Sequence, residues 1–296
     1  MSDDSSTVPL RQLGQYLADW RSRAGLTQAK AAELLDISSS SLQRLEQGQN
    51  SRPSSYVIQA AGELYGASED LIAAFVGLSK KGTRKRWWHQ YGDLIPVTFN
   101  VYVGLEARAV ELRSYQPELI PGLLQIPAYN RELERLAFPD DDEAEIERRV
   151  QIRVQRQHIV KRMRQPVRLD VVIGEAAVRR ILGSRAVMAA QIRYLADMST
   201  KPNISVRLLP FEAGFPDGSS MTPFVILDFG QTPLGAAAEP TVVFLEGSVG
   251  EVYLEDEDDV RFYHRSYESL RNAALDDIAS RDRLRQIAWE HEKRER

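Results

Sequence analysis

Side chains that can read DNA bases lie close together in the first quarter of the sequence. A hydroxyl, an amide and a guanidinium can all bind base edges, and arginine with guanine and glutamine with adenine are the usual pairs. Ser39, Ser40, Gln43 and Arg44 carry these groups within six residues. On helical spacing all four face away from the apolar residues, so we predict that this face enters a DNA groove.

Three more polar residues are placed to hold the DNA backbone. Gln28 is in the first turn of the preceding helix, where a side-chain amide and free backbone N–H groups can bind a phosphate. Asn50 and Arg52 follow the reading helix and can hold the next phosphate. We assign Arg21 and Glu46 to structure instead, as an ion pair between the first and third helices. If that pair is buried, removing one partner costs about 3–5 kcal/mol.

The reading residues require two short helices joined by a tight turn. Thr27 and Ser38 suit the N-cap position, so a helix is expected to begin at each. The turn falls at Asp36-Ile37-Ser38, where one residue usually needs a positive φ, and Asp36 takes the place that glycine normally fills. Ala32 is small enough to let the two helices approach closely. The residues expected to point inward are Leu35, Ile37, Leu42 and Leu45.

An all-helical domain is predicted around this pair. Leu10, Leu13, Leu17 and Trp20 recur at intervals of three and four residues, which gives one apolar stripe. Further helices are expected after residues 53 and 68, so the fold predicted for residues 10–79 is an all-α, five-helix domain. Residues 1–9 are expected to be a disordered tail. The alternative is a small helical bundle whose serines merely fill the surface.

These residues together resemble the DNA-binding domain of the phage-repressor and Cro-like (XRE) family, over about residues 10–78. The matching positions are Thr27, Gln28, Ala32, Ser38, Arg44, Leu45, Glu46, Gly48 and Pro53. The resemblance implies base readers at Ser39, Ser40, Gln43 and Arg44, and phosphate contacts at Gln28, Asn50 and Arg52. Asp36 departs from the glycine that is usual in the family.

Composition limits the other classes of protein. A length of 296 residues suggests two domains, on a prior of roughly 150 residues each. Cysteine is absent and the four histidines lack metal-ligand spacing, so neither a metal nor a cofactor is expected. No signal peptide and no apolar run of about 20 residues is found, so we expect a cytoplasmic protein, associated with the nucleoid through DNA. A net charge of −4 argues against a non-specific DNA coat, although a local surface can still be basic.

A mixed α/β domain is predicted for residues 87–296. It follows a basic connector at residues 80–86, which is either a solvated linker or a segment that lies along DNA phosphates. The predicted strands are 169–173, 204–209, 224–229, 241–245 and 251–254, the last two forming a hairpin. The predicted helices are 143–163, 176–198 and 259–288.

Two unusual segments of this domain have two interpretations. One is the aromatic pair Trp87 and Trp88, and the other is the proline- and glycine-containing stretch 115–125. They form core and turn, or they line a groove for a peptide or small ligand. The candidate partner- or ligand-binding residues are Trp87, Trp88, Tyr115, Pro121, Leu124 and Glu175. A carboxylate–guanidinium pair involving Glu175 would be structural rather than catalytic.

The same domain resembles the Scr1-like (DUF5753-type) antitoxin-like domain that is attached to many actinobacterial XRE regulators, over about residues 87–288. The matching segments are 87–88, 115–125, 156–157, 172–176, 188–192, 202–204, 209–214 and 244–246. The resemblance implies association with a small partner protein encoded nearby, in a toxin–antitoxin-like or developmental pair, and hence a partner-sensing role.

Two functions therefore remain open. The first is a sequence-specific transcription regulator that binds a double-stranded operator as a homodimer, on half-sites about 34–36 Å or a multiple apart. The second is an antitoxin-like protein that mainly sequesters a small partner, with DNA binding secondary. An enzyme is not expected, because the sequence has no Gly-x-Ser-x-Gly motif, P-loop, GxGxxG motif or cysteine nucleophile.

Overall fold

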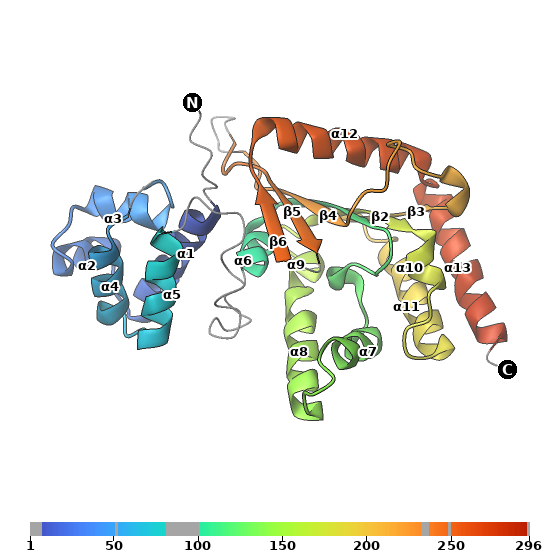
Figure 1. Cartoon of the computed structure of the whole chain (residues 1–296), viewed down its shortest axis with the longest axis horizontal. Helices are drawn as coiled ribbons and strands as arrows, with labels where there is room; N and C mark the ends of the chain where they lie inside the picture. The colour runs from blue at the N-terminus through green and yellow to red at the C-terminus, as the bar shows by residue number, and fades with distance from the viewer. Residues whose placement is uncertain (1–7, 51–52, 81–100, 232–236, 248–249, 295–296) are drawn as a thin grey trace. The chain divides into compact units, whose positions relative to one another are not determined.

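The computed structural model describes residues 8–50, 53–80, 101–231, 237–247 and 250–294 (Figure 1). The chain divides into two compact units, residues 1–105 with 248–255, and residues 106–247 with 256–296. Several predictions of the sequence lie outside the described residues. They concern the tail at 1–7, the connector at 81–86, and the side chains of Arg52, Trp87 and Trp88.

The described residues of the first unit up to residue 80 fold into helices. Its helices are α1 (Val8–Arg23), α2 (Gln28–Leu34), α3 (Ser39–Glu46), α4 (Ser55–Leu64) and α5 (Glu69–Lys80), and α6 (Val101–Arg108) follows. One apolar core joins α1 to α5, and its fully buried side chains include Leu13, Leu17, Leu42 and Ile58. The predicted apolar stripe of α1 is confirmed, because Leu10, Leu13 and Leu17 are buried.

A six-stranded mixed sheet organises the rest of the chain. Its strands are β1 (Glu111–Gln116), β2 (Arg168–Gly174), β3 (Ile204–Leu209), β4 (Phe224–Asp228), β5 (Val242–Gly247) and β6 (Gly250–Leu254), in the order β3-β2-β1-β4-β5-β6. The β1–β2 and β2–β3 pairs are parallel, whereas β1–β4 and β4–β5 are antiparallel. Parallel neighbours need crossover connections, and helices supply them here. The predicted mixed α/β domain is confirmed.

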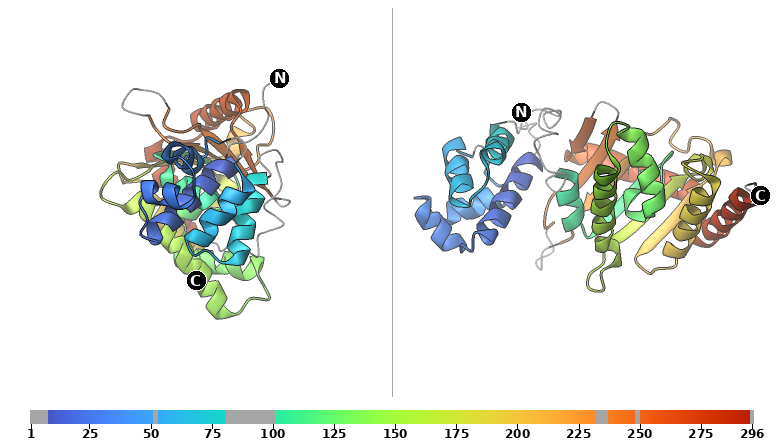
Figure 2. Two further views of the ribbon diagram at one scale, coloured as in Figure 1. Left: turned by 90° about the vertical axis from the view of Figure 1, so that its left-hand side faces the viewer. Right: turned by 90° about the horizontal axis from the view of Figure 1, so that it is seen from below.

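Helices cover both faces of this sheet (Figures 1 and 2). The β1–β2 connection contains η3 (Gly122–Leu124), α7 (Pro127–Ala137), α8 (Glu143–Arg156) and α9 (His158–Lys161), and the β2–β3 connection contains α10 (Glu175–Arg179) and α11 (Arg185–Met198). The short helix η4 (Phe211–Ala213) follows β3, and α12 (Glu257–Ala273) and α13 (Asp277–Lys293) end the chain. Helix α12 lies on one face and α8 and α11 on the other, while α13 packs against α11 and β3.

Three predicted helices are each divided in two. The helix predicted at 143–163 breaks at Gln157 and ends before Met163, which is fully exposed rather than on an apolar face. The helix predicted at 176–198 is interrupted at residues 180–184, where Gly183 has a φ of +66°. The helix predicted at 259–288 is interrupted before Asp276, whose carboxylate caps α13. A new N-cap therefore outweighs continued helical periodicity at two of these breaks.

The predicted strands β2 to β6 are confirmed, but the sequence analysis missed β1. Its sequence alternates poorly, because only Leu112 and Tyr115 are large apolar residues among charged and polar neighbours. Pairing with β2 on one side and β4 on the other nevertheless places β1 inside the sheet. Tertiary pairing overrides a weak strand pattern in this case.

Candidate nucleic-acid interface

The turn between α2 and α3 depends on one aspartate in a left-handed conformation. Asp36 has a φ of +53°, as predicted. Its N–H donates to the carbonyl of Glu33 at 3.2 Å, and the N–H of Ile37 donates to the carbonyl of Ala32 at 3.0 Å. These two bonds satisfy the last carbonyls of α2, as the usual glycine-containing helix ending does. The backbone therefore reverses here without a glycine.

Helix α3 is fixed at both ends. At its start the Ser38 hydroxyl accepts a hydrogen bond from the N–H of Ser41 at 3.1 Å, which confirms the predicted N-cap. At its end Gly48 has a φ of +68°, and the N–H of Gln49 donates to the carbonyl of Arg44 at 2.9 Å. A Cβ at Gly48 would lie 2.4 Å from the Cα of Arg11, so α1 also requires glycine there.

An ion pair ties α1 to the end of α3, as predicted. Arg21 donates through Nε and Nη2 to the two carboxylate oxygens of Glu46, at 2.6 and 3.0 Å, and through Nη1 to the carbonyl of Leu26 at 2.9 Å. The two side chains are mostly buried, with 17% of Arg21 and 6% of Glu46 exposed. The hydrogen bonds to Glu46 raise the pKa of Arg21, and burial opposes that rise. The pair therefore holds α3 at a fixed orientation to α1.

Gln28 is part of this clamp. Its Nε2 donates to Glu46 Oε2 at 3.0 Å, and its side chain is half-buried. The predicted phosphate contact at Gln28 therefore depends on its remaining amide hydrogen and on the backbone at the start of α2. Asn50 is exposed in the segment that follows α3, consistent with the phosphate contact predicted there.

The outward face of α3 carries the predicted base readers. Ser39, Ser40, Gln43 and Arg44 are all exposed, whereas Leu42 and Leu45 on the opposite face are buried in the core. The predicted division into two faces is confirmed. Arg44 forms no ion pair with any residue that the structure describes, so its guanidinium is available to a base. The Ser40 hydroxyl lies 3.0 Å from that of Ser38, and this contact competes with a base for the same group.

Three predicted partner-binding residues are buried in the second unit. Tyr115, Pro121 and Leu124 are all buried, and the Tyr115 ring packs on Phe224 with 5.9 Å between centroids. Two glutamine side chains hold the backbone at residues 124 and 125. Gln157 Nε2 donates to the carbonyl of Gln125 at 2.6 Å, and the amide of Gln191 donates to the carbonyl of Leu124 at 2.7 Å. These contacts favour the core-and-turn interpretation over a lined groove.

Glu175 is also buried, and its partners are arginines. It accepts hydrogen bonds from Arg179 at 2.6 Å, Arg283 at 3.2 Å and the N–H of Phe211 at 3.1 Å. Burial favours a higher pKa for this carboxyl, but these donors outweigh it and hold the pKa below its ordinary value. Glu175 therefore anchors α10 to α13 and η4, in keeping with the structural role expected of such a pair.

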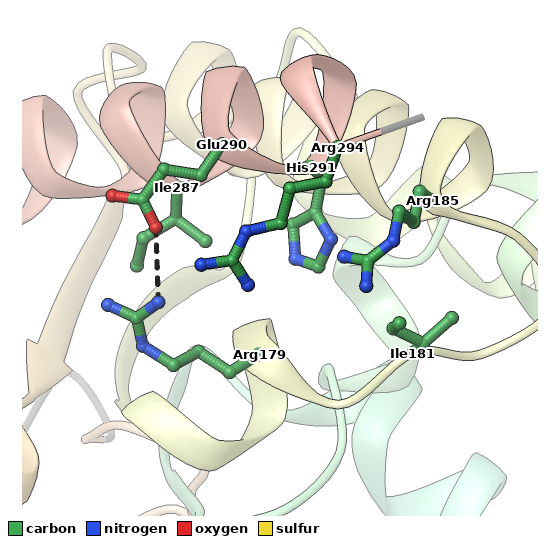
Figure 3. Close-up of a pocket in the computed structure, with 7 residues that line it drawn as sticks. All are labelled: Arg179, Ile181, Arg185, Ile287, Glu290, His291 and Arg294. Atoms are coloured by element: carbon green, nitrogen blue, oxygen red, sulfur yellow. Dashed lines mark hydrogen bonds and ion pairs between the residues drawn. The ribbon is translucent and has the colours of Figure 1, made fainter. Parts of the chain in front are cut away.

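A basic pocket lies beside this network, and the sequence analysis did not predict it. Arg179, Arg185, His291 and Arg294 line it together with three other residues (Figure 3). These residues come from α10, from the start of α11 and from the end of α13. Such widely separated positions leave no local pattern, and only the packing of α11 on α13 brings them together.

Two further properties of the described residues bear on the class of protein. They contain no group of three or more His, Asp or Glu side chains that could hold a metal ion. No described helix combines the length and the apolar character needed to cross a membrane.

Comparison with known families agrees with this geometry. A family model described as a domain of unknown function (DUF5753) matches residues 99–286, and another described as a helix-turn-helix domain matches residues 12–75. The first covers more than half of the chain, and the second contains α2, the Asp36 turn and α3. No curated protein and no solved structure matches the chain. The predicted helix-turn-helix and DUF5753-type domains are thus both confirmed.

Proposed function

The chain belongs to the DUF5753 domain family, and we propose that it is a sequence-specific, DNA-binding transcriptional regulator of the XRE type. In this proposal α3 reads an operator, and the second unit senses a small partner protein or ligand. The protein acts in the cytoplasm, on the chromosome, and has no catalytic role. Its origin is actinobacterial, on the resemblance of residues 87–288.

One observation carries the DNA-binding part of the proposal. The polar face of α3 is exposed, and the helix is held rigidly at both ends. This face presents the consecutive residues Gln43 and Arg44. Base recognition depends on side chains held in a fixed position by their helix and on contacts that set the helix in the groove. The clamp of Arg21, Glu46 and Gln28 provides the first of these. We infer that Asn50 and Arg52 provide backbone contacts on the C-terminal side.

The operator is proposed to be read by a homodimer. A single α3 contacts only a few base pairs, and two copies on half-sites about 34–36 Å apart double the recognised sequence. Specific binding then exceeds non-specific binding even for a chain with a net charge of −4, because the local charge at the interface decides the contact.

A direct test is fluorescence anisotropy or gel shift of the full chain on the DNA upstream of its own gene, against a duplex of scrambled sequence. Arg44→Ala should weaken the specific complex by about 1–3 kcal/mol for each half-site, the discrimination that one good bidentate base contact contributes. Gln28→Ala should weaken binding to both duplexes similarly, as loss of a phosphate contact does. It should leave the salt dependence unchanged, because Gln28 carries no charge and its contact releases no counterion.

Arg23→Ala is the matched control. Arg23 is exposed in the last turn of α1, so the substitution removes the same charge from the same unit without touching α3. If Arg44→Ala binds the specific duplex as tightly as Arg23→Ala does, the assignment of the reading face is rejected.

An antitoxin-like interaction protein is the second candidate function. It is favoured by exposed aromatic side chains in the second unit: Phe211 is 62% exposed and Phe215 is 69% exposed. Large exposed apolar groups near one another are typical of protein contacts. Co-purification with the product of the adjacent gene tests this candidate. If Arg44→Ala captures that product as efficiently as the native chain does, partner binding is separate from DNA binding.

A further inference from the structure

The pocket in the second unit lies between three helices (Figure 3). It is bounded by the end of α10, the loop after it, the start of α11 and the last turns of α13. The cavity measures about 140 Å³, and its lining residues are Arg179, Ile181, Arg185, Ile287, Glu290, His291 and Arg294. A cavity of this size accommodates a small molecule of a few heavy atoms rather than a peptide.

Positive charge exceeds negative charge around this cavity. Arg179 is the one arginine of the lining with carboxylate partners among the described residues, Glu290 at 3.2 Å and Glu175 at 2.6 Å. Arg185 and Arg294 form no ion pair within the described part of the chain. Glu290 is the one carboxylate of the lining, and it pairs with Arg179. Two guanidinium groups therefore line the cavity without an ion-pair partner of their own, although mutual repulsion opposes such an arrangement.

The position of Arg185 makes this excess harder to explain by the fold alone. Arg294 directly follows α13, where the negative end of the helix dipole favours a cation. Arg185 is the first residue of α11, after the N-cap Ser184, where the helix dipole disfavours a cation and favours an anion. An anion in the cavity would interact favourably with Arg185, Arg294 and the start of α11 at once.

A buried histidine in the lining has an unsatisfied ring nitrogen. His291 is only 6% exposed, and its Nε2 lies 3.0 Å from the carbonyl of Val178, so Nε2 carries the hydrogen and donates. Its Nδ1 is buried and has no hydrogen-bond partner among the described residues. Buried polar atoms almost always have a partner, and an exception needs an explanation. Figure 3 shows the His291 ring between the side chains of Arg185 and Arg294.

We propose that this pocket binds a small phosphate monoester, with the phosphate group between Arg185, Arg294 and Nδ1 of His291. Guanidinium groups bind phosphate oxygens in paired hydrogen bonds. The histidine nitrogen accepts from a phosphate hydroxyl, or donates to a phosphate oxygen when the ring is protonated. Ile181 and Ile287 supply an apolar surface for the carbon part of the ligand. The proposal names the ligand that the second unit senses, and it therefore rests on the proposed function.

Isothermal titration calorimetry of the full chain tests the binding step without DNA. The probes are inorganic phosphate, glycerol phosphate and acetate, each at constant ionic strength. Glycerol phosphate should bind best, inorganic phosphate more weakly, and acetate not measurably. Equal binding of acetate and glycerol phosphate would overturn the choice of phosphate, and tighter binding of inorganic phosphate than of glycerol phosphate would overturn the choice of a monoester.

Variants locate the site. The double substitution Arg185→Gln with Arg294→Gln should weaken glycerol phosphate binding about tenfold or more, because it removes two charge-assisted contacts. Arg285→Gln is the matched control, since Arg285 is an exposed arginine of α13 outside the lining. Unchanged affinity in the double variant, or an equal loss in Arg285→Gln, would overturn the proposal.

A spectroscopic measurement covers the case in which the double variant does not fold. In the native chain labelled with ¹⁵N at histidine, glycerol phosphate should shift the Nδ1 resonance of His291, and unchanged histidine resonances at saturation would reject this contact. Failure of the proposed function would look different. Calorimetric binding without a specific DNA complex would reject the regulator and retain the pocket, and the converse result would retain the regulator and reject the pocket.

Discussion

Loss of the Arg21 guanidinium should destabilise the first unit severely. In the native structure the Glu46 carboxylate accepts three hydrogen bonds, two from Arg21 at 2.6 and 3.0 Å and one from Gln28 at 3.0 Å. Arg21→Met removes two of the three and leaves a carboxylate that is only 6% exposed. Breaking a buried ion pair from one side costs about 3–5 kcal/mol, because the remaining charge stays buried without compensation. Since 17% of Arg21 is itself exposed, we expect the lower end, about 3 kcal/mol.

Hydrogen–deuterium exchange of the full chain measures this locally. Peptides covering α1 and α3 report the free energy of opening of the first unit separately from that of the second. A loss of about 3 kcal/mol corresponds to exchange more than a hundredfold faster, since each 1.4 kcal/mol is a factor of ten. The matched control is Arg23→Met, which removes an exposed arginine two residues further along the same helix and should leave exchange nearly unchanged.

A double variant tests the physical reason. Arg21→Met combined with Glu46→Leu removes both charges, so no buried carboxylate is left uncompensated, and part of the lost stability should return. Two results would refute the assignment of Arg21 and Glu46 as a buried pair. One is exchange in the double variant as fast as in Arg21→Met, and the other is a loss of less than about 1 kcal/mol of opening free energy in Arg21→Met.

Three other predictions have defined outcomes. Ser38→Ala removes the cap of α3 and should lower its stability by about 1 kcal/mol, measured by hydrogen exchange of α3. Ser54→Ala should lower the stability of α4 by less, because Ser54 makes no side-chain cap bond. Equal losses of stability would contradict this. Gly14→Ala should destabilise α1 although alanine favours helices, since its Cβ would lie 2.4 Å from the Glu46 carbonyl oxygen; a raised Tm would argue otherwise. Burial and a nearby arginine lower the pKa of His264, so the unfolded chain takes up its proton first. Tm should therefore fall on acidification from pH 7.5 to 5.5, and an equally steep fall in His264→Gln would exclude this histidine as a cause.

The reading motif was largely predictable from the sequence, because each part of it depends on residues close along the chain. The caps at Thr27 and Ser38 bind N–H groups three residues on, and the positive φ of Asp36 follows from the need to reverse between two helices. The inward and outward faces of α3 follow from helical periodicity alone. The prediction that Arg21 pairs with Glu46 is confirmed although the two residues are 25 positions apart, since the pair joins helices within one small core.

Boundaries inside the larger domain were less predictable. A helical pattern runs through residues 180–184 and 274–276, and only the capping by Ser184 and Asp276 shows that new helices begin there. Leu124 and Tyr115 had two interpretations from the sequence, core and turn or, alternatively, the lining of a groove. Burial of both side chains favours core and turn, and burial depends on what the sheet and its helices place around each side chain.

The sequence by itself determined the helix-turn-helix and the chemistry of its exposed face, because caps, turns and amphipathic helices are local. Only the tertiary structure decided that β1 lies inside the sheet and that Arg185 and His291 share one cavity. A strand inside a sheet is stabilised by neighbours on both sides, whatever its own alternation. A pocket between α10, α11 and α13 exists only once packing has brought together residues as far apart as Arg179 and Glu290, which are separated by 111 positions.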